Sequence, residues 1–225
     1  MMNNLFPQAE VYLFDMDETL INADCDVTWK HFAVKHGLAP ANALDEAERF
    51  YQEYCAGTLD INEFIAFQLA EFAGKTVQEA AEMSRLHFEE FIRPAMRQAP
   101  LEFIRQIKAA GKVTALLSST NSVISSPVAA AFGIDSVLGT QLELGSDGRY
   151  TGNISGIYAV KENKVTVARQ FGEAIGFGLE KFSTYGDSYN DRFILKACGF
   201  ATAVNPGAEL RKLAEENQWQ IVEWN

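Results

Sequence analysis

Four short apolar runs, each of which stops at a polar side chain or a turn, constrain the fold of this chain most strongly. They are Val11–Phe14, Val113–Leu117, Lys181–Tyr185 and Phe200–Val204, with Trp219–Val222 as a candidate fifth. Continuous runs of this length are typical of strands that are buried on both faces of a parallel sheet. The pattern therefore predicts several short parallel strands in one sheet.

Helical spacing of apolar residues separates these runs. After Pro100, and again after Lys164 and Asp191, apolar side chains recur three or four positions apart. Strands that alternate with helices form a parallel sheet flanked by helices. The polar residues that end the strands would then gather at the carboxyl edge of the sheet, where open α/β sheets bind their ligands. We predict a Rossmann-like α/β fold with a site at this edge.

The stretch from about Ala23 to Arg93 differs because it has no strand-like run. Its apolar residues repeat at helical spacing, with interruptions at Gly37–Pro40, Gly57 and Gly74. This pattern predicts a small bundle of about four helices that is inserted after the first strand.

Two domains follow from these patterns. Residues 1–22 and 94–225 are expected to form the α/β core, and residues 23–93 the helical cap. Within the core, Leu142–Leu144 and Arg149–Thr151 flank a glycine-containing loop and predict a β-hairpin.

The balance of charged residues limits the possible partners. The chain of 225 residues carries 19 Lys and Arg against 30 Asp and Glu, a formal net charge of −11. Such a charge disfavours binding to nucleic acid or to an anionic membrane surface. No apolar run approaches the roughly 18–20 residues of a membrane span, and neither a signal peptide nor a disulfide framework is evident. We expect a cytoplasmic protein without nucleic-acid or membrane partners, and the sequence leaves its oligomeric state open.

The strongest chemical signal is the pair Asp15 and Asp17, which directly follows the first apolar run. Carboxylates at positions i and i+2 of an extended segment point to the same side. Two close carboxylates usually share a cation or a proton, and Mg²⁺ favours oxygen ligands of this kind. A solvated acidic turn is the alternative interpretation.

Ser118, Ser119 and Thr120 follow the second run. Hydroxyl groups and backbone N–H groups at a strand-to-helix turn can hold phosphate oxygens. The alternative is that one of these residues caps the next helix.

A third polar cluster follows the run at Lys181–Tyr185. Asp187 could reach a metal ion from the strand end, and Asp191 would lie about one helical turn further along. Capping by Asp187 or Ser188 is the alternative here.

Lys164 is expected in the first turn of a helix, where a cation opposes the helix dipole and an anionic partner would explain it. Lys161 competes for the same role, and for either residue a solvated surface lysine is the alternative.

The order of these motifs along the chain resembles the haloacid dehalogenase superfamily of phosphatases. The resemblance covers nearly the whole chain and is closest to the phosphoserine phosphatase-like branch, in which a helical cap follows the first motif. It implies that Asp15 is the nucleophile that becomes an aspartyl phosphate, and that Asp17 is the general acid and base. It also implies that Mg²⁺ is held by Asp15, the backbone carbonyl of Asp17, and Asp187.

The resemblance assigns roles to the remaining motif residues as well. Ser118 would bind a phosphate oxygen, with Ser119 and Thr120 as neighbouring donors. Lys164 would pair with the phosphoryl group and with Asp15. Supporting roles fall to Asp191, which would orient Lys164 or complete the metal shell, and to its neighbour Asn190. The substrate implied is a small phosphorylated metabolite, and hydrolysis of a phosphomonoester is favoured over cleavage of a carbon–halogen bond.

Two departures from the phosphoserine phosphatases bear on the substrate. Asp24 stands at the position of a Glu that binds the substrate ammonium, so we expect Asp24 to contact the substrate. The cap Arg that binds the substrate carboxylate falls near Gln68, and residues 50–84 contain no Arg. Burying a carboxylate without a cation is costly. An amine such as histidinol phosphate or phosphoethanolamine is therefore favoured over phosphoserine.

Two other function classes remain open on the sequence alone. A phosphotransferase or mutase would use the same intermediate with an acceptor other than water. A non-catalytic metabolite-binding module would not need the nucleophile, so the intact motif set argues against it. We also expect the cap to open and close about hinges near residues 22–24 and 93–94.

Overall fold

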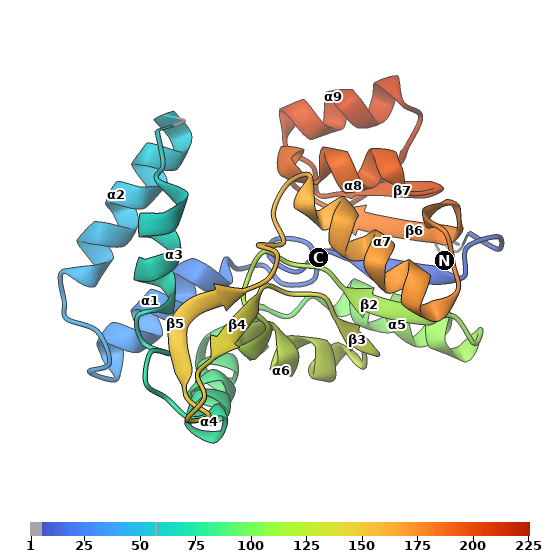
Figure 1. Cartoon of the computed structure of the whole chain (residues 1–225). Helices are drawn as coiled ribbons and strands as arrows, with labels where there is room; N and C mark the ends of the chain where they lie inside the picture. The colour runs from blue at the N-terminus through green and yellow to red at the C-terminus, as the bar shows by residue number, and fades with distance from the viewer. Residues whose placement is uncertain (1–5, 57) are drawn as a thin grey trace.

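A six-stranded parallel sheet forms the centre of the computed structural model, which describes residues 6–56 and 58–225 (Figure 1). The strands lie in the order β3 (Ser136–Val137), β2 (Val113–Leu116), β1 (Val11–Phe14), β6 (Phe182–Gly186), β7 (Phe200–Val204) and β8 (Gln220–Val222). All neighbouring strands are parallel. The five apolar runs are confirmed as strands. The central strands β1 and β6 are buried on both faces, which explains why their sequences are continuous apolar runs. The two-residue strand β3 was not predicted.

Helices cover both faces of this sheet, as predicted. Along β1, Tyr12 and Phe14 pack toward α5 (Gln98–Ala109) and α6 (Ser122–Phe132). Val11 and Leu13 alternate with them and belong to the cluster on the other face. The helices on that face are α7 (Asn163–Ile175), α8 (Arg192–Ala197) and α9 (Ala208–Glu216).

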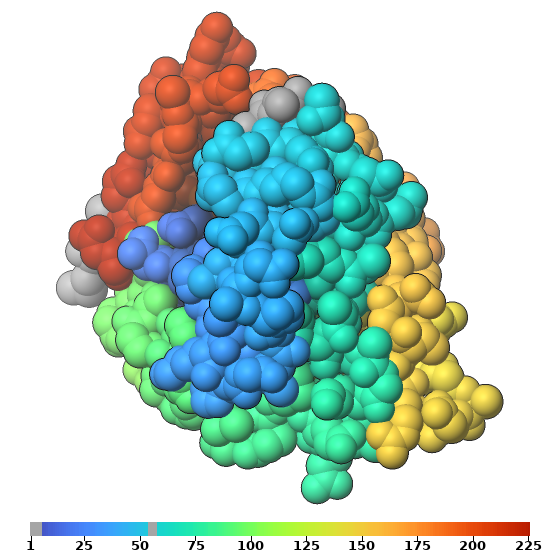
Figure 2. Space-filling view, turned by 90° about the vertical axis from the view of Figure 1, so that its left-hand side faces the viewer, coloured from blue at the N-terminus to red at the C-terminus, as the bar shows by residue number. Residues whose placement is uncertain are grey.

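The cap consists of helices inserted between β1 and α5, as the periodicity predicted. They are α1 (Cys25–Lys35), α2 (Ala43–Ala56), α3 (Ile61–Leu69) and α4 (Val77–His87), followed by a π-helical turn at Phe88–Ile92 and a 3₁₀ turn at Arg93–Ala95. The breaks at Gly37–Pro40 and Gly74 are confirmed, whereas Gly57 lies outside the described residues. In the space-filling view, the cap helices cover the face toward the viewer (Figure 2).

An ion pair is buried inside the cap. The ammonium of Lys30 lies 2.7 Å from Oε2 of Glu71, and the two side chains are 1% and 4% exposed. Lys30 also donates to the carbonyl oxygen of Phe67 at 2.6 Å, and the indole of Trp29 donates to Glu71 at 3.0 Å. The network ties α1 to the end of α3, and Trp29 stacks on Phe72 with their ring centroids 4.7 Å apart.

Another buried polar residue of the cap is a histidine that lies among aromatic rings. His87 is 1% exposed, and its Nε2 lies 3.0 Å from the hydroxyl of Thr28. Its Nδ1 is buried without a hydrogen-bond partner among the described residues. Trp29, Phe32 and Phe91 surround the ring. Burial lowers the pKa of His87 to about 4, against a weak opposing effect of Glu90.

The predicted hairpin is confirmed as β4 (Gln141–Leu144) and β5 (Tyr150–Ser155), which pair antiparallel. The hairpin lies against the cap (Figure 1). Tyr150 accepts a hydrogen bond from the N–H of Gly74 at 2.8 Å and donates one to the carbonyl of Lys75 at 2.9 Å. The two linkers between core and cap also meet, since the N–H of Asn22 donates to the carbonyl of Ala95 at 2.8 Å. Within the described parts of the chain, no helix has the length and apolar character needed to cross a membrane.

Candidate active site

Three carboxylates meet at the carboxyl edge of the sheet. Asp15 directly follows β1 and Asp187 directly follows β6, and these two strands are parallel neighbours. Asp191 ends the 3₁₀ turn Tyr189–Asp191 and turns back toward them. One oxygen from each carboxylate lies within 4.8 Å of the others. The edge of the sheet therefore carries an all-oxygen cluster that can receive a hard cation.

Lys164 is the cation that the structure places in this cluster. It lies in the first turn of α7, and its Nζ is 2.6 Å from Oδ1 of Asp15 and 2.6 Å from Oδ1 of Asp191. Burial alone would lower its pKa, but Asp15 and Asp191 raise it, so the ammonium stays charged. Lys161 is exposed, and the structure does not bring it to the site.

The cluster holds three carboxylates and one lysine, and the pKa values of Asp15 and Asp187 are raised. Burial raises the pKa of Asp15 well above its usual range, and Asp191 and Asp187 add to this against the opposing charge of Lys164. Burial also raises the pKa of Asp187 to about 7, with Asp191 contributing. Excess negative charge at a buried site favours a bound cation. The donor set therefore fits Mg²⁺.

Asp17 lies next to this cluster, but other partners hold its side chain. Oδ1 accepts a hydrogen bond from the backbone N–H of Cys25 at 2.8 Å, and Oδ2 accepts one from the hydroxyl of Thr120 at 2.9 Å. Burial raises the pKa of Asp17 to about 6, and the charge of Asp24 adds to this. A carboxyl group with a pKa near neutrality can both give and take a proton.

The loop that follows β2 makes hydrogen bonds to Asp17 and within itself. The hydroxyl oxygen of Ser118 accepts a hydrogen bond from the N–H of Thr120 at 3.1 Å, and Thr120 in turn donates to Asp17. The N-cap of α6 is Asn121, whose Oδ1 accepts from two backbone N–H groups at 3.1 Å. The interpretation of Ser118–Thr120 as a helix cap was therefore wrong.

Further groups fix the acidic cluster. Thr19, which sequence reasoning left without a role, donates to Oδ1 of Asp187 at 3.1 Å. Its position two residues after Asp17 was the available signal. Ser188 caps the turn with Asp191, so the capping alternative holds for Ser188 and not for Asp187. A Cβ at Gly186 would lie 2.8 Å from Oδ2 of Asp191, which explains the glycine at the strand end. Asn190, half-buried, belongs to the same turn.

The side chains of Asp24 and Asp26 lie in different surroundings. Asp24 is exposed, and its carboxylate caps α1 by accepting from the N–H of Val27 at 3.0 Å. Asp26, which the sequence did not single out, lines a small cavity between cap and core. Gln68 and the cap aromatic Phe64 line this cavity too, whereas Trp29 and Phe32 are buried inside the cap. The full lining is Asp26, Phe64, Ile65, Gln68 and Leu69 from the cap, and Ser119, Asn121, Thr140, Ile154 and Tyr158 from the core.

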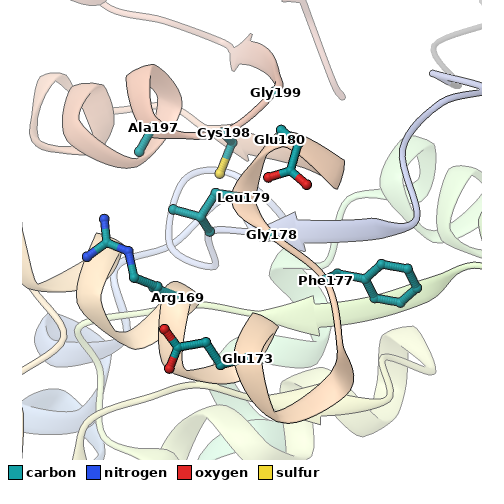
Figure 3. Close-up of a pocket in the computed structure, with 9 residues that line it drawn as sticks. All are labelled: Arg169, Glu173, Phe177, Gly178, Leu179, Glu180, Ala197, Cys198 and Gly199. Atoms are coloured by element: carbon teal, nitrogen blue, oxygen red, sulfur yellow. The ribbon is translucent and has the colours of Figure 1, made fainter.

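A larger groove lies at the opposite edge of the sheet, at the amino ends of β6 and β7. Figure 3 shows Arg169 and Glu173 of α7 on one side of it and Leu179 and Cys198 on the other. None of the predicted site residues lines this groove. The chemistry of the chain therefore points to the carboxyl edge.

Known proteins are similar to this chain in sequence and in fold. A family model described as haloacid dehalogenase-like hydrolase matches residues 12–196. A histidinol-phosphatase from Neisseria meningitidis serogroup C is 40% identical over 93% of this chain and 96% of its own length. The phosphoserine phosphatase SerB1 of Mycobacterium tuberculosis is 28% identical over 92% of this chain and 68% of its own length. A crystal structure of a protein of unknown function from Bordetella pertussis superposes with a TM-score of 0.86 at 32% identity, covering 95% of this chain and 98% of that one.

Proposed function

Because this chain belongs to the haloacid dehalogenase-like hydrolase family, we propose that it is a Mg²⁺-dependent phosphatase that hydrolyses histidinol phosphate through an aspartyl phosphate on Asp15. Its relatives are phosphatases of small phosphorylated substrates, and the chain is a hydrolase of that kind. The finer proposal adds the intermediate, the metal ion and the substrate.

One observation supports the reaction above all others: two carboxylates, two residues apart, are held in different environments. Asp15 lies against the ammonium of Lys164, whose charge opposes the effect of burial and favours the anionic form that a nucleophile needs. Asp17 lies between the hydroxyl of Thr120 and the N–H of Cys25, and its pKa is about 6. Neighbouring titratable groups with different environments are typical of a nucleophile and its acid–base partner.

The proposed reaction has two steps. A carboxylate oxygen of Asp15 forms a bond to phosphorus as the bond to the alkoxide oxygen breaks, and Asp17 gives its proton to the leaving alcohol. Asp17 then takes a proton from the water that attacks the aspartyl phosphate. This second step releases inorganic phosphate and restores both carboxyl groups.

The remaining residues bind and orient. Lys164 would neutralise the phosphoryl oxygens, and the loop of Ser118 and Ser119 would donate hydrogen bonds to them. The side chains of Asp15 and Asp187 and the backbone carbonyl of Asp17 would hold Mg²⁺, which would offset the repulsion between nucleophile and phosphate. Asp191 would keep Lys164 directed at Asp15.

Two observations favour histidinol phosphate over phosphoserine. The histidinol-phosphatase relative matches nearly its whole length at 40% identity. Among the residues that the structure describes, the lining of the cavity beside the site includes an aspartate and no lysine or arginine, which suits an amine and disfavours a carboxylate.

The test is phosphate release from histidinol phosphate, phosphoserine and an aryl phosphate, each with Mg²⁺ and with a chelator. We expect Mg²⁺-dependent release with a preference for histidinol phosphate. Asp15→Asn should abolish release, and the exposed Asp45→Asn is the matched control that should retain it. Acid-quenched wild-type enzyme should carry one phosphoryl group on a peptide that contains Asp15.

Two results would contradict the proposal. Release that persists in Asp15→Asn would exclude the aspartyl phosphate. Phosphoryl transfer to added alcohols without release to water would identify a phosphotransferase instead.

A further inference from the structure

We propose that Arg97 is a positioning residue for the metal site, because its guanidinium holds the turn that presents the backbone carbonyl of Asp17. Arg97 lies where the chain returns from the cap to the core, between the 3₁₀ turn Arg93–Ala95 and α5. The part that the Asp17 carbonyl plays in holding Mg²⁺ comes from the proposed function, on which this inference rests.

The turn after β1 contains a residue with a strained backbone. Glu18 has a φ of 55°, in the left-handed region that residues other than glycine rarely adopt. Its N–H donates to the carbonyl of Ala23 at 3.3 Å. Because the peptide between Asp17 and Glu18 is planar and trans, this N–H and the carbonyl of Asp17 point in opposite directions. The direction of the proposed metal ligand therefore depends on how Glu18 is held.

Arg97 holds this turn from the other side. Its Nη2 donates to the carbonyl of Glu18 at 3.3 Å and to Oδ1 of Asn22 at 2.9 Å. Its backbone N–H donates to the carbonyl of Leu20 at 3.1 Å. The N–H and the carbonyl of Glu18 lie on either side of its φ and ψ angles, so hydrogen bonds to both groups fix the strained conformation.

The other end of the guanidinium is anchored on the sheet. Nη1 of Arg97 donates to the carbonyl of Trp224 at 2.9 Å, and Asn205 exchanges two further hydrogen bonds with the backbone of Trp224. The indole is 4% exposed and stacks on Tyr185, with ring centroids 5.6 Å apart, while the ring of Phe14 lies 6.4 Å away. These two rings belong to β6 and β1, the strands that lead to the metal-binding carboxylates. Arg97 therefore ties the turn to the strands on which the site is built.

The partners of Arg97 require an arginine. Its side chain is 11% exposed, and among the described residues its ion pair is to Glu18 at 3.5 Å, whose own side chain is half exposed. Its other acceptors are neutral oxygens, and its Nε is buried without a partner in the described parts of the chain. Burying a cation in this way costs free energy, which favours a role in the site over a role in stability alone. A planar fork of donors can reach these separate oxygens, whereas a lysine ammonium cannot.

The test measures Mn²⁺ binding without substrate, by electron paramagnetic resonance, because Mn²⁺ prefers the same oxygen ligands as Mg²⁺. Arg97→Met should weaken Mn²⁺ binding about 10-fold, as expected for loss of a residue that orients a metal ligand. Electrostatics alone predicts the opposite sign, since removing a cation favours the binding of another. Arg105→Met, an arginine of α5 with a 68% exposed side chain, is the matched control and should bind Mn²⁺ like wild type.

Kinetics and a rescue variant separate positioning from stability. In Arg97→Met, kcat for histidinol phosphate should fall about 10-fold at limiting Mg²⁺ and recover at saturating Mg²⁺, with KM little changed. Adding Glu18→Gly should restore most of the lost Mn²⁺ affinity, because glycine adopts a φ of 55° without strain. Trp224→Leu should weaken Mn²⁺ binding by itself and add little to Arg97→Met, since both act through one contact.

Two results would overturn the inference. One is unchanged or tighter Mn²⁺ binding in Arg97→Met, with only a lower midpoint of urea unfolding, and the other is equal weakening in Arg105→Met. If Arg97→Met does not fold, Arg97→Lys gives the same comparison, because it keeps the charge and loses the fork. Wild type that binds Mn²⁺ but releases no phosphate from any ester would refute the proposed function, and weaker Mn²⁺ binding in Arg97→Met would then still support the inference.

Discussion

Replacing the buried His87 tests whether the interior of the cap keeps this imidazole uncharged. An unfolded histidine has a pKa of about 6.5, whereas burial lowers the pKa of His87 to about 4. Between these values the unfolded chain binds a proton that the folded protein does not. The stability that the neutral ring contributes is therefore complete above about pH 6.5 and is lost as the pH falls toward 4.

The size of this effect follows from the two pKa values. At about 1.4 kcal/mol for each pH unit between them, the difference amounts to about 3 kcal/mol. Most of it should be lost by pH 4.5. Such a loss is a large part of the roughly 5–15 kcal/mol that stabilises a typical domain.

The assay is urea unfolding at several pH values from 7.5 to 4.5, for wild type and His87→Phe. Phenylalanine keeps the aromatic packing but binds no proton, so the difference between the two unfolding free energies isolates the histidine from other acidic groups. We expect wild type to lose about 2–3 kcal/mol more than the variant over this range. The exposed His31→Gln is the control and should follow wild type. Parallel curves for wild type and His87→Phe would refute the reasoning, and His87→Gln offers a second non-titrating variant if phenylalanine prevents folding.

Three other substitutions test the cap and the site. Lys30→Met alone should destabilise the protein by about 3–5 kcal/mol in urea unfolding, because it leaves Glu71 buried without its cation. The double variant with Glu71→Leu should recover most of this loss. Gly186→Ala should lower kcat strongly and cost about 1–3 kcal/mol of stability, because the new methyl group would displace the buried Asp191. Thr120→Val should lower kcat about 10-fold with KM little changed, since one of the two donors to the buried acid–base carboxyl is lost.

The sequence predicted the sheet well, because burial on both faces leaves a continuous apolar run. Val11–Phe14 and Phe200–Val204 are strands with these bounds. The strand Ser136–Val137 is half-buried and only two residues long, too short for any periodicity. Strand order could not be read from the runs, since it depends on which helices cross the sheet.

The positions of the candidate site residues were predictable where a motif follows a strand directly, and less so where a helix sets the direction of a side chain. The sequence favoured Lys164 and left Lys161 as a competitor, and in the structure Lys164 reaches the carboxylates from the first turn of α7. Asp24 and Asp26 lie two residues apart at the start of α1, and capping turns Asp24 toward its own helix. Which of the two reaches the cavity depends on how α1 packs against α3.

The hydrogen bonds at both ends of the cap bear on how substrate enters. The linkers are joined to each other at Asn22 and Ala95, while Tyr150 of the hairpin is bonded to Gly74 and Lys75 of the cap. A cap that opens must either carry the hairpin with it or break these last two bonds and the hydrogen bond from Arg149 to the carbonyl of Gly74, at about 1 kcal/mol each. Breaking all three would make the accessible form a minor population of roughly one per cent or less. Every measured substrate affinity would then be weaker than the intrinsic one by that fraction, and a variant that loosens the contact would bind more tightly without any new contact to the substrate.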